Sequence, residues 1–408
     1  MTGRDRPLRV AIFAESYLPY LSGVTVSTEA LARGLGAAGH QVLLVAPAPA
    51  GAAAPGTAGA PGPEPSYAWL PSYQGPPPVP AGYRMPLPWP SPALRTAREV
   101  APDVVHAQSP FVSGLMARRV AQRTGAPLVF THHTRFGDYS HYLGPLARPA
   151  AAVVGAYLRE FWRGCAAIVA PGSELAAELR ARVGPPPAPR VEVIPTGVDV
   201  PAIQALEPVD VRAAAGWTDD TLVVASHGRL AREKSVDVLV EAFARAARDV
   251  PRLRLLLVGG GPEEDDLRQR TAGSDLAGRV HLTGPLPRPE ALAHVRGADL
   301  FAFASRTETQ GLVLAEALVA GLPVVALAGP GVADSVRDGA DGLIVDGADR
   351  AGALAAGLTR LAADDALRAR MAAAARDGAA RFDLPGRIGQ VVNLYRELIA
   401  ERRARHPG

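Results

Sequence analysis

The stretch A-S-R-T-E-T-Q-G-L-V-L-A-E-A-L, residues 304–318, shows how the second half of this 408-residue chain is built. The apolar residues 298–303 before it predict a buried strand, and residues 310–320 predict a helix that is apolar almost all round. A strand, a short turn and a helix in this order form the repeating unit of α/β domains with a parallel sheet. The turn follows the carboxyl end of a strand, which is where open sheets of this kind bind ligands.

Two carboxylates in this stretch are candidates for ligand binding. Glu308 lies in the turn, beside the backbone N–H groups of Thr309, Gln310 and Gly311 at the start of the helix. Glu316 lies inside the apolar helix, where a buried carboxylate needs a partner. A bound polar ligand is one such partner. The alternatives are that Glu308 belongs to a helix cap and that Glu316 pairs with an arginine of the core.

The same alternation of strands and helices occurs twice along the chain. Residues 8–46 contain a strand, a helix and a second strand, and a new series begins at the strand 222–226. The P-T-G-V-D turn at 195–199 separates the two series. We therefore predict an α/β protein with two Rossmann-like, doubly wound domains, residues 1–199 and 200–386, which face each other across a cleft. The final helix, within 387–408, is expected to return to the first domain.

The basic residues are distributed unusually. Of 43 basic residues, Lys234 is the one lysine, and the rest are arginines. Arg229 and Lys234 flank the turn after the strand 222–226, a position suited to a diphosphate. A lysine meets phosphate as a compact point charge, although its survival on a helix surface by chance is the alternative. The net charge of +3 and the lack of a dense basic run argue against a nucleic-acid partner.

Three loops carry weaker signals. Gly23 opens the first helix and allows a ligand to approach the backbone closely. The Gly-rich loop 259–262 precedes four acidic residues, which repel phosphate, so we predict a tight turn near a base or ribose. The loop T-H-H-T-R-F-G-D-Y, residues 131–139, follows a strand and contains His132 and His133. We expect a histidine that contacts substrate there and no metal, because no helical H-x-x-x-H pair or cysteine ligand accompanies it.

The remaining features concern the compartment. Cys165 is the single cysteine, so we expect a reducing compartment and no disulfide. The N-terminus shows no signal peptide, and no apolar run is long enough to cross a bilayer, which predicts a cytoplasmic protein. The helix at 148–165 has apolar residues on one face with Arg148, Arg159 and Arg163 around it. It is either a core helix or an interfacial element on an anionic membrane, on the inner face of the plasma membrane. The Ala/Gly/Pro-rich residues 47–65 predict a surface insertion, and the proline-rich residues from there to Pro92 predict extended loop or edge structure.

Taken together, these motifs resemble a known family. The chain is similar to the retaining glycosyltransferases of family 4, which have the GT-B fold, over nearly its whole length. The resemblance rests on five motifs: G-V-T-V-S at 23–27, T-H-H-T-R-F-G-D-Y at 131–139, V-I-P-T-G-V-D at 193–199, G-R-L-A-R-E-K-S at 228–235, and the E-x7-E pair. The wording around 307–318 looks most like enzymes that glucosylate diacylglycerol, and is also similar to phosphatidylinositol mannosyltransferases.

The resemblance implies roles for individual residues. Arg229 and Lys234 would hold the donor diphosphate and stabilise the leaving group, Glu308 would bind hydroxyls of the transferred sugar, and Glu316 would bind the ribose. The donor site would also include the start of the helix, Thr309 to Leu312. His133 would lie beside the reacting sugar, and Gly23 beside the phosphates.

The resemblance also implies a reaction. A hexose would pass from a UDP-glucose or GDP-mannose type donor to an acceptor hydroxyl with retention, without a metal, because the cations Arg229 and Lys234 serve the diphosphate. The acceptor is expected to be a membrane glycerolipid, or alternatively a soluble sugar or inositol. Three rivals stay open: a sugar-nucleotide epimerase, a pyridoxal-phosphate phosphorylase that uses Lys234, and an exported two-domain binding protein.

Overall fold

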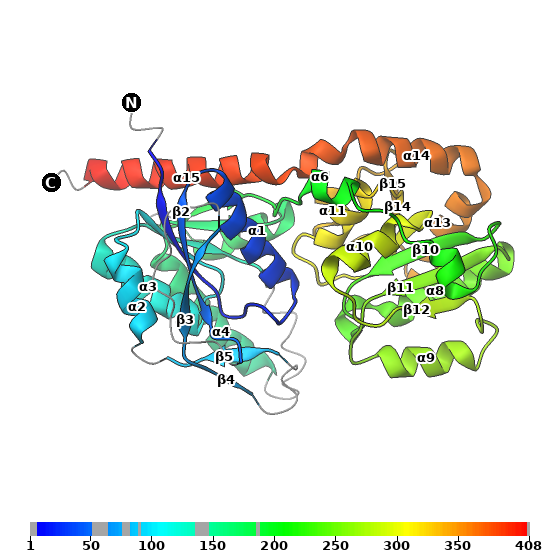
Figure 1. The fold of residues 1–408 in the computed structure, drawn as a ribbon, viewed down its shortest axis with the longest axis horizontal. Helices are drawn as coiled ribbons and strands as arrows, with labels where there is room; N and C mark the ends of the chain where they lie inside the picture. The colour runs from blue at the N-terminus through cyan, green and yellow to red at the C-terminus, as the bar shows by residue number, and fades with distance from the viewer. Residues whose placement is uncertain are drawn as a thin grey trace. The chain divides into compact units, whose positions relative to one another are not determined.

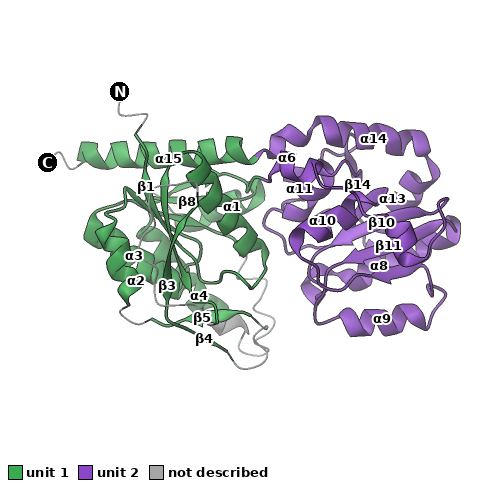
Figure 2. Cartoon of the chain, viewed as in Figure 1, with its two compact units in different colours: residues 1–197, 384–408 green, residues 198–383 purple. Residues whose placement is uncertain are grey.

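A computed structural model describes residues 6–50, 64–75, 82–88, 91–134, 147–184 and 188–405, with the side chains of 147–150 excluded. The chain forms two compact units (Figures 1 and 2). Unit 1 contains Met1–Gly197 and Leu384–Gly408, and unit 2 contains Val198–Asp383. Their limits lie within three residues of the boundaries predicted at 199 and 386.

Unit 1 is built on a parallel, seven-stranded sheet with the order β3-β2-β1-β6-β7-β8-β9. Its central strand β1 pairs with β2 on one side and β6 on the other, so that Val10 lies between Val42 and Val104. The strands of the sheet are β1 (Arg9–Phe13), β2 (Gln41–Pro47), β3 (Ser66–Leu70), β6 (Val104–Ala107), β7 (Leu128–Thr131), β8 (Ala167–Ala170) and β9 (Arg190–Val193). The strand order reverses direction between β1 and β6, which makes this pair the topological switch point.

Unit 2 repeats the plan with a six-stranded parallel sheet in the order β12-β11-β10-β13-β14-β15. Val224 of β10 lies between Leu255 of β11 and Leu300 of β13. The strands are β10 (Leu222–His227), β11 (Leu253–Val258), β12 (Val280–Leu282), β13 (Leu300–Phe303), β14 (Val324–Leu327) and β15 (Gly342–Val345). Here the switch point lies between β10 and β13. The predicted pair of Rossmann-like sheets is confirmed.

Helices cover both faces of each sheet, which explains why the central strands are runs of buried apolar residues. In unit 1 one face carries α2 (Pro92–Glu99), α3 (Val112–Thr124), α4 (Ala147–Arg163) and α5 (Ser173–Val183). The other face carries α1 (Gly23–Ala37) and α15 (Leu384–Arg405). The two pack closely, because a Cβ on Gly34 of α1 would lie 2.6 Å from Ile388 of α15. Tyr395 of α15 is fully buried and hydrogen-bonds His106 Nδ1 at 2.6 Å, so the last helix is anchored in unit 1.

In unit 2 the two core clusters are covered by different sets of helices. One face carries α8 (Val236–Asp249), α9 (Glu264–Ala272), α13 (Arg350–Ala363) and α14 (Asp365–Asp377). The other carries α6 (Val200–Gln204), α7 (Val211–Ala215), α10 (Arg288–Arg296), α11 (Leu312–Val319), α12 (Val332–Ser335) and the short helix η3 (Ala379–Phe382). The helix expected at 310–320 begins at Leu312, because Gly311 adopts a φ of +70° as its N-cap.

The segment 66–99 is more regular than its proline content suggested. We predicted extended loop or edge structure, and the structure contains the edge strand β3, the antiparallel pair β4 (Ser72–Gln74) and β5 (Arg84–Pro86), and α2. β3 forms because Ala68 and Leu70 are buried against the sheet while Tyr67 and Trp69 stack on each other. Most of the insertion predicted at 47–65 lies outside the described residues.

Candidate active site

The donor-site residues predicted in unit 2 lie in the loops that follow β10 and β13, and in helix α11, which the second loop enters. These two strands are adjacent, so their carboxyl ends meet at the switch point of the sheet. The first loop ends in the short helix η2 (Arg232–Lys234), and the second comprises residues 304–311. Thr307 Oγ1 donates a 3.1 Å hydrogen bond to the carbonyl of Glu233, which ties the two loops together.

Lys234 and Glu308 meet at this junction. The ammonium of Lys234 donates to Glu308 Oε1, and the two side chains keep 31% and 20% of their surface exposed. Arg229 lies on the same loop, is 49% exposed, and approaches Glu233 at 3.8 Å. The structure therefore brings Lys234 to Glu308 and leaves the side chain of Arg229 about half exposed at the same edge of the sheet.

The start of α11 is held by its neighbours. Gln310 is buried and Gly311 has a positive φ, while Thr309 and Leu312 are partly exposed. A Cβ on Gly331 would lie 2.8 Å from the backbone of Gln310, so this position needs a glycine for the next loop to pack on the turn. The backbone N–H groups that begin α11 are thus kept at a fixed place beside Glu308.

Glu316 has a protein partner, as the alternative in the sequence analysis proposed. Arg288, the first residue of α10, donates to Glu316 Oε1 from Nη2 at 2.6 Å and from Nε at 3.2 Å. The Glu316 side chain is 4% exposed and that of Arg288 is 34% exposed. Sequence reasoning missed Arg288. The need of a buried carboxylate for a cation was a signal, but it did not indicate which of the arginines would supply it.

The Gly-rich loop 259–261 serves as a packing element. A Cβ on Gly259 would lie 2.2 Å from the carbonyl oxygen of Gly228, and one on Gly261 would lie 2.3 Å from that of Leu230. The amide of Leu230 in turn donates to the carbonyl of Gly260 at 3.0 Å. The loop is a tight turn, as predicted, and its glycines let it support the loop that contains Arg229. Its nearness to a base or ribose stays a prediction.

Two predicted residues lie in unit 1: His133 follows β7, and Gly23 is the first residue of α1. His133 Nε2 hydrogen-bonds Gln108 Oε1 at 2.7 Å, and burial lowers the pKa of His133 to about 4 although the side chain is partly exposed. The imidazole is therefore neutral at pH 7. Gly23 is exposed, with open space where a Cβ would stand, and Ser22 caps the helix by accepting from the amide of Thr25.

Gln108 is the second residue that sequence reasoning missed. It follows β6, at the switch point of unit 1, and is 3% exposed. Its Nε2 is buried and has no acceptor among the described residues, while its Oε1 meets His133. It lines a cavity of about 40 Å³ in unit 1, together with His106, Thr131 and Ser27. A lone glutamine after a strand carries no sequence signal, so only the fold reveals this contact.

Several residues in and after the loop 131–139 lie outside the described residues. Arg135, Asp138, Tyr139 and His141 fall in the range 135–146, and nothing is described of the Arg148 side chain. The described part of the chain contains no group of three metal-ligating side chains. It also contains no helix long and apolar enough to cross a membrane.

Helix α4 was expected to have its apolar residues near one face. Leu158, Phe161 and Trp162 are buried, but Val153 is 69% exposed, so Val153 does not share the buried face of the helix. Residues 151–153 are all exposed, and the contacts of the helix with the core begin at Val154. The outer face of α4 therefore combines an exposed valine with the exposed Arg159 and Arg163.

Comparisons with known proteins agree with this architecture. Residues 21–201 match the family Glycosyltransferase Family 4, and residues 210–378 match Glycosyl transferases group 1. The chain is 29% identical to an alpha-monoglucosyldiacylglycerol synthase of Acholeplasma laidlawii, over 82% of this chain and 84% of the relative. It is 32% identical to a D-inositol 3-phosphate glycosyltransferase of a Nocardioides species, over 74% of this chain and 68% of the relative.

Solved structures share the fold at low sequence identity. Sucrose-phosphate synthase of Thermosynechococcus elongatus superposes with a TM-score of 0.76 at 22% identity, covering 97% of this chain and all of the other. HepE of Anabaena, solved in complex with UDP and glucose, superposes with a TM-score of 0.72 at 18% identity, covering 96% of this chain and 100% of the other. With two Rossmann-like units and a relative 32% identical over most of its length, the chain belongs to the group 1, family 4 glycosyltransferases.

Proposed function

We propose that this glycosyltransferase moves a hexose from a nucleoside diphosphate sugar, of the UDP-glucose or GDP-mannose type, to a hydroxyl of a membrane glycerolipid, with retention at the anomeric carbon. The observation that carries the proposal is the junction of Lys234 with Glu308 at the switch point of unit 2. The cations Arg229 and Lys234 suit the diphosphate of a donor, and the carboxylate of Glu308 suits the hydroxyls of a sugar. Unit 2 is thus assigned the donor, and unit 1 the acceptor.

The chemistry follows from the charges. In a retaining transfer the bond between the anomeric carbon and the phosphate oxygen breaks, and the acceptor oxygen bonds to the same face of that carbon. The proton of the acceptor hydroxyl passes to the leaving phosphate. Negative charge develops on this phosphate, and Lys234 and Arg229 stabilise it without a metal ion. As a neutral imidazole, His133 would accept a hydrogen bond from a sugar hydroxyl or donate one to it, without adding charge.

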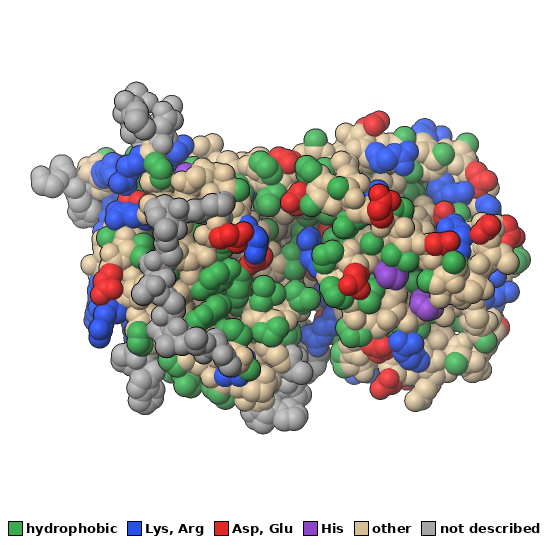
Figure 3. All heavy atoms as spheres, viewed as in Figure 1, with side chains coloured by type: hydrophobic (Ala, Val, Ile, Leu, Met, Phe, Trp, Pro, Cys, Tyr) green, Lys and Arg blue, Asp and Glu red, His purple; other side chains and the backbone are tan. Residues whose placement is uncertain are grey.

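A lipid acceptor is supported by the surface of unit 1. Leu18 and Leu21 follow β1, and Phe111 and Leu115 follow β6; all four are between 38% and 53% exposed. These strands form the switch point of unit 1, so exposed apolar side chains accompany its ligand-binding edge. Figure 3 shows hydrophobic side chains gathered on the face of unit 1 in view. Arg159 and Arg163 on α4 would add attraction to anionic headgroups, at the inner face of the plasma membrane.

A soluble inositol-type acceptor is the second candidate. It is supported by the 32% identity to a D-inositol 3-phosphate glycosyltransferase, which exceeds the 29% identity to the glucosyldiacylglycerol synthase. The exposed leucines have no role in this alternative.

The test is product formation from UDP-glucose, UDP-galactose and GDP-mannose, each offered with diacylglycerol or phosphatidylinositol in liposomes, or with inositol 3-phosphate in solution. Each reaction is run with and without EDTA. A glycolipid formed in EDTA supports the proposal and identifies the donor. Product with inositol 3-phosphate alone moves the acceptor to the second candidate. Donor turnover without any acceptor product points to an epimerase or hydrolase, and no turnover of any donor overturns the donor assignment.

A further inference from the structure

The carboxylate of Glu316 is held by one of its two oxygens. Both donors of Arg288, Nη2 at 2.6 Å and Nε at 3.2 Å, meet Oε1. Within the described part of the chain, Oε2 accepts no hydrogen bond. The fork of the guanidinium is planar and rigid, so two donors on one oxygen fix the direction in which the other oxygen points.

The surroundings of Glu316 make this arrangement necessary. Helix α11 is buried on nearly all sides, and Leu314, Ala315, Ala317 and Leu318 around Glu316 have no exposed surface. An unpaired carboxylate in such a helix would favour another conformation or its neutral form. Arg288 compensates the charge, and about a third of its own side-chain surface, 34%, stays exposed to solvent.

Arg288 lies at the edge of the sheet that contains the other donor-site residues. It ends the loop that follows β12, and Gly284 of this loop bridges to Gly259 of the loop after β11. That loop contacts the backbone of Gly228 and Leu230, beside Arg229. The loops after β10, β11 and β12 are therefore joined, and Arg288 connects them to α11.

We propose that Arg288 is a positioning residue for the nucleoside: it orients Glu316 so that the open oxygen Oε2 accepts hydrogen bonds from the ribose hydroxyls of the donor. The inference rests on the donor site of the proposed function. Arg288 acts through Glu316 and contacts no reacting atom. If the pair only joined α10 to α11, its loss would weaken the binding of all nucleotides alike.

The experiment measures equilibrium binding of UDP and 2′,3′-dideoxy-UDP, and of GDP and 2′,3′-dideoxy-GDP, to the full chain. For the wild type we expect the nucleotide with both hydroxyls to bind about 10- to 100-fold more tightly than its dideoxy analogue, since hydrogen bonds to a carboxylate are strong. In Arg288→Gln this ratio should fall to about 3 or less, while the dideoxy nucleotide binds nearly as before. Arg288→Lys should keep part of the ratio, and Glu316→Gln should lose it.

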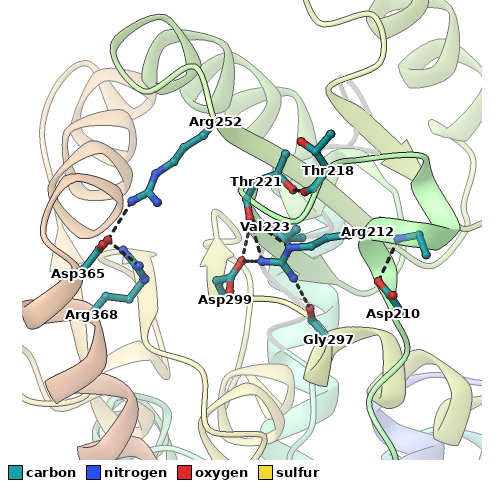
Figure 4. A network of polar contacts seen from close by, with 11 residues as sticks. Asp210, Arg212, Thr218, Thr221, Val223, Arg252, Gly297, Asp299, Asp365 and Arg368 are labelled. Carbon is teal, nitrogen blue, oxygen red and sulfur yellow. Dashed lines mark hydrogen bonds and ion pairs between the residues drawn. The ribbon is translucent and has the colours of Figure 1, made fainter.

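Arg212→Gln is the matched control, because it also removes a partly buried ion pair of unit 2. Arg212 pairs with Asp299 and donates to the carbonyl of Thr221 at 2.9 Å, as Figure 4 shows. Asp299 precedes β13 and so lies at the opposite end of the sheet from the donor-site loops. This variant should lose stability but keep the wild-type ratio.

The outcomes separate the two proposals. A wild-type ratio in Arg288→Gln overturns the positioning role and leaves the donor site intact. A wild type that binds neither UDP nor GDP overturns the donor site itself. If Arg288→Gln does not fold, as judged by circular dichroism, the ratios of Arg288→Lys and Glu316→Gln decide, and wild-type values in both overturn the inference.

Discussion

Lys234 and Glu308 form an ion pair across 74 positions of sequence, and the pair joins the loop after β10 to the loop after β13. Without a donor, the lysine and the carboxylate satisfy each other. When a donor binds, the proposed function requires the ammonium to turn to the diphosphate and the carboxylate to the hexose. Both side chains are partly exposed, so the pair itself contributes about 1 kcal/mol or less to stability.

We expect Lys234→Ala to lower kcat/KM for transfer by at least about 100-fold, because it removes a charge that stabilises the leaving phosphate. The thermal unfolding midpoint should change little, since the lost ion pair is partly exposed. Steady-state kinetics and circular dichroism give the two values.

Lys234→Arg is the control for charge. A planar guanidinium cannot take the place of a compact ammonium, so this variant should stay at least about 10-fold below the wild type. Wild-type turnover in Lys234→Ala would contradict the assignment.

Glu308→Gln should weaken the binding of the hexose part of the donor and leave the binding of the nucleotide part nearly unchanged. It keeps the size of the side chain and removes the charge that is proposed to bind sugar hydroxyls. We expect binding of the nucleotide sugar to weaken about 10-fold or more, while binding of the nucleoside diphosphate changes less than about 3-fold. Isothermal titration calorimetry with both ligands measures the difference. Equal weakening of both would place Glu308 at the phosphates instead.

Much of this site could be predicted from the sequence. The strand-turn-helix order places the loops of Lys234 and Glu308 at carboxyl ends of parallel strands, and adjacency of β10 and β13 then brings them together. Arg288 and Gln108 could not be predicted in this way. Their partners Glu316 and His133 lie 28 and 25 positions away on other elements, and such contacts depend on how those elements pack.

The edge strand β3 was only partly predicted, for a different physical reason. Its two buried residues, Ala68 and Leu70, alternate with the aromatic residues Tyr67 and Trp69, which are partly exposed and also apolar. The period of two that marks a strand is therefore masked, and the prolines nearby suggest a loop.

Two histidines should make the chain less stable in mild acid. Burial lowers the pKa of His106 to about 3, with a further contribution from His133, and burial lowers that of His133 to about 4, from an ordinary value of 6.5. Between pH 6.5 and 4 the unfolded chain binds protons that the folded chain does not. The stabilisation is therefore complete above pH 6.5 and is lost as the pH falls, by about 2 kcal/mol per histidine at pH 5.

Urea denaturation at pH 7 and pH 5 measures this loss. His106→Gln should lower stability at pH 7, because His106 hydrogen-bonds both Tyr395 and Thr131, but it should reduce the difference between the two pH values by about 2 kcal/mol. An unchanged difference would show that His106 does not titrate as described.

If the acceptor is a membrane lipid, substitutions on the apolar surface of unit 1 should slow transfer to the acceptor without affecting binding of the donor. Leu18→Ser with Leu21→Ser should lower transfer to diacylglycerol in liposomes by about 10-fold, because both leucines are exposed beside the switch point of unit 1 and would contact the bilayer. Binding of the nucleotide sugar should be unchanged, since the substitutions lie in the other unit from Lys234 and Glu308. Transfer that is equally fast with the double variant would favour the inositol-type acceptor.

The basic face of α4 tests the same membrane contact through charge. Arg159→Ser with Arg163→Ser should weaken sedimentation with anionic liposomes several-fold, because each arginine near such a surface contributes about 1 kcal/mol, and the effect should vanish at high salt. The control replaces Arg248 and Arg270 of unit 2, which are 72% and 50% exposed, and so changes the net charge by the same amount. If both pairs reduce sedimentation equally, net charge explains the binding. If neither does, α4 serves the core of unit 1 through Leu158, Phe161 and Trp162, and membrane contact must come from the leucines alone.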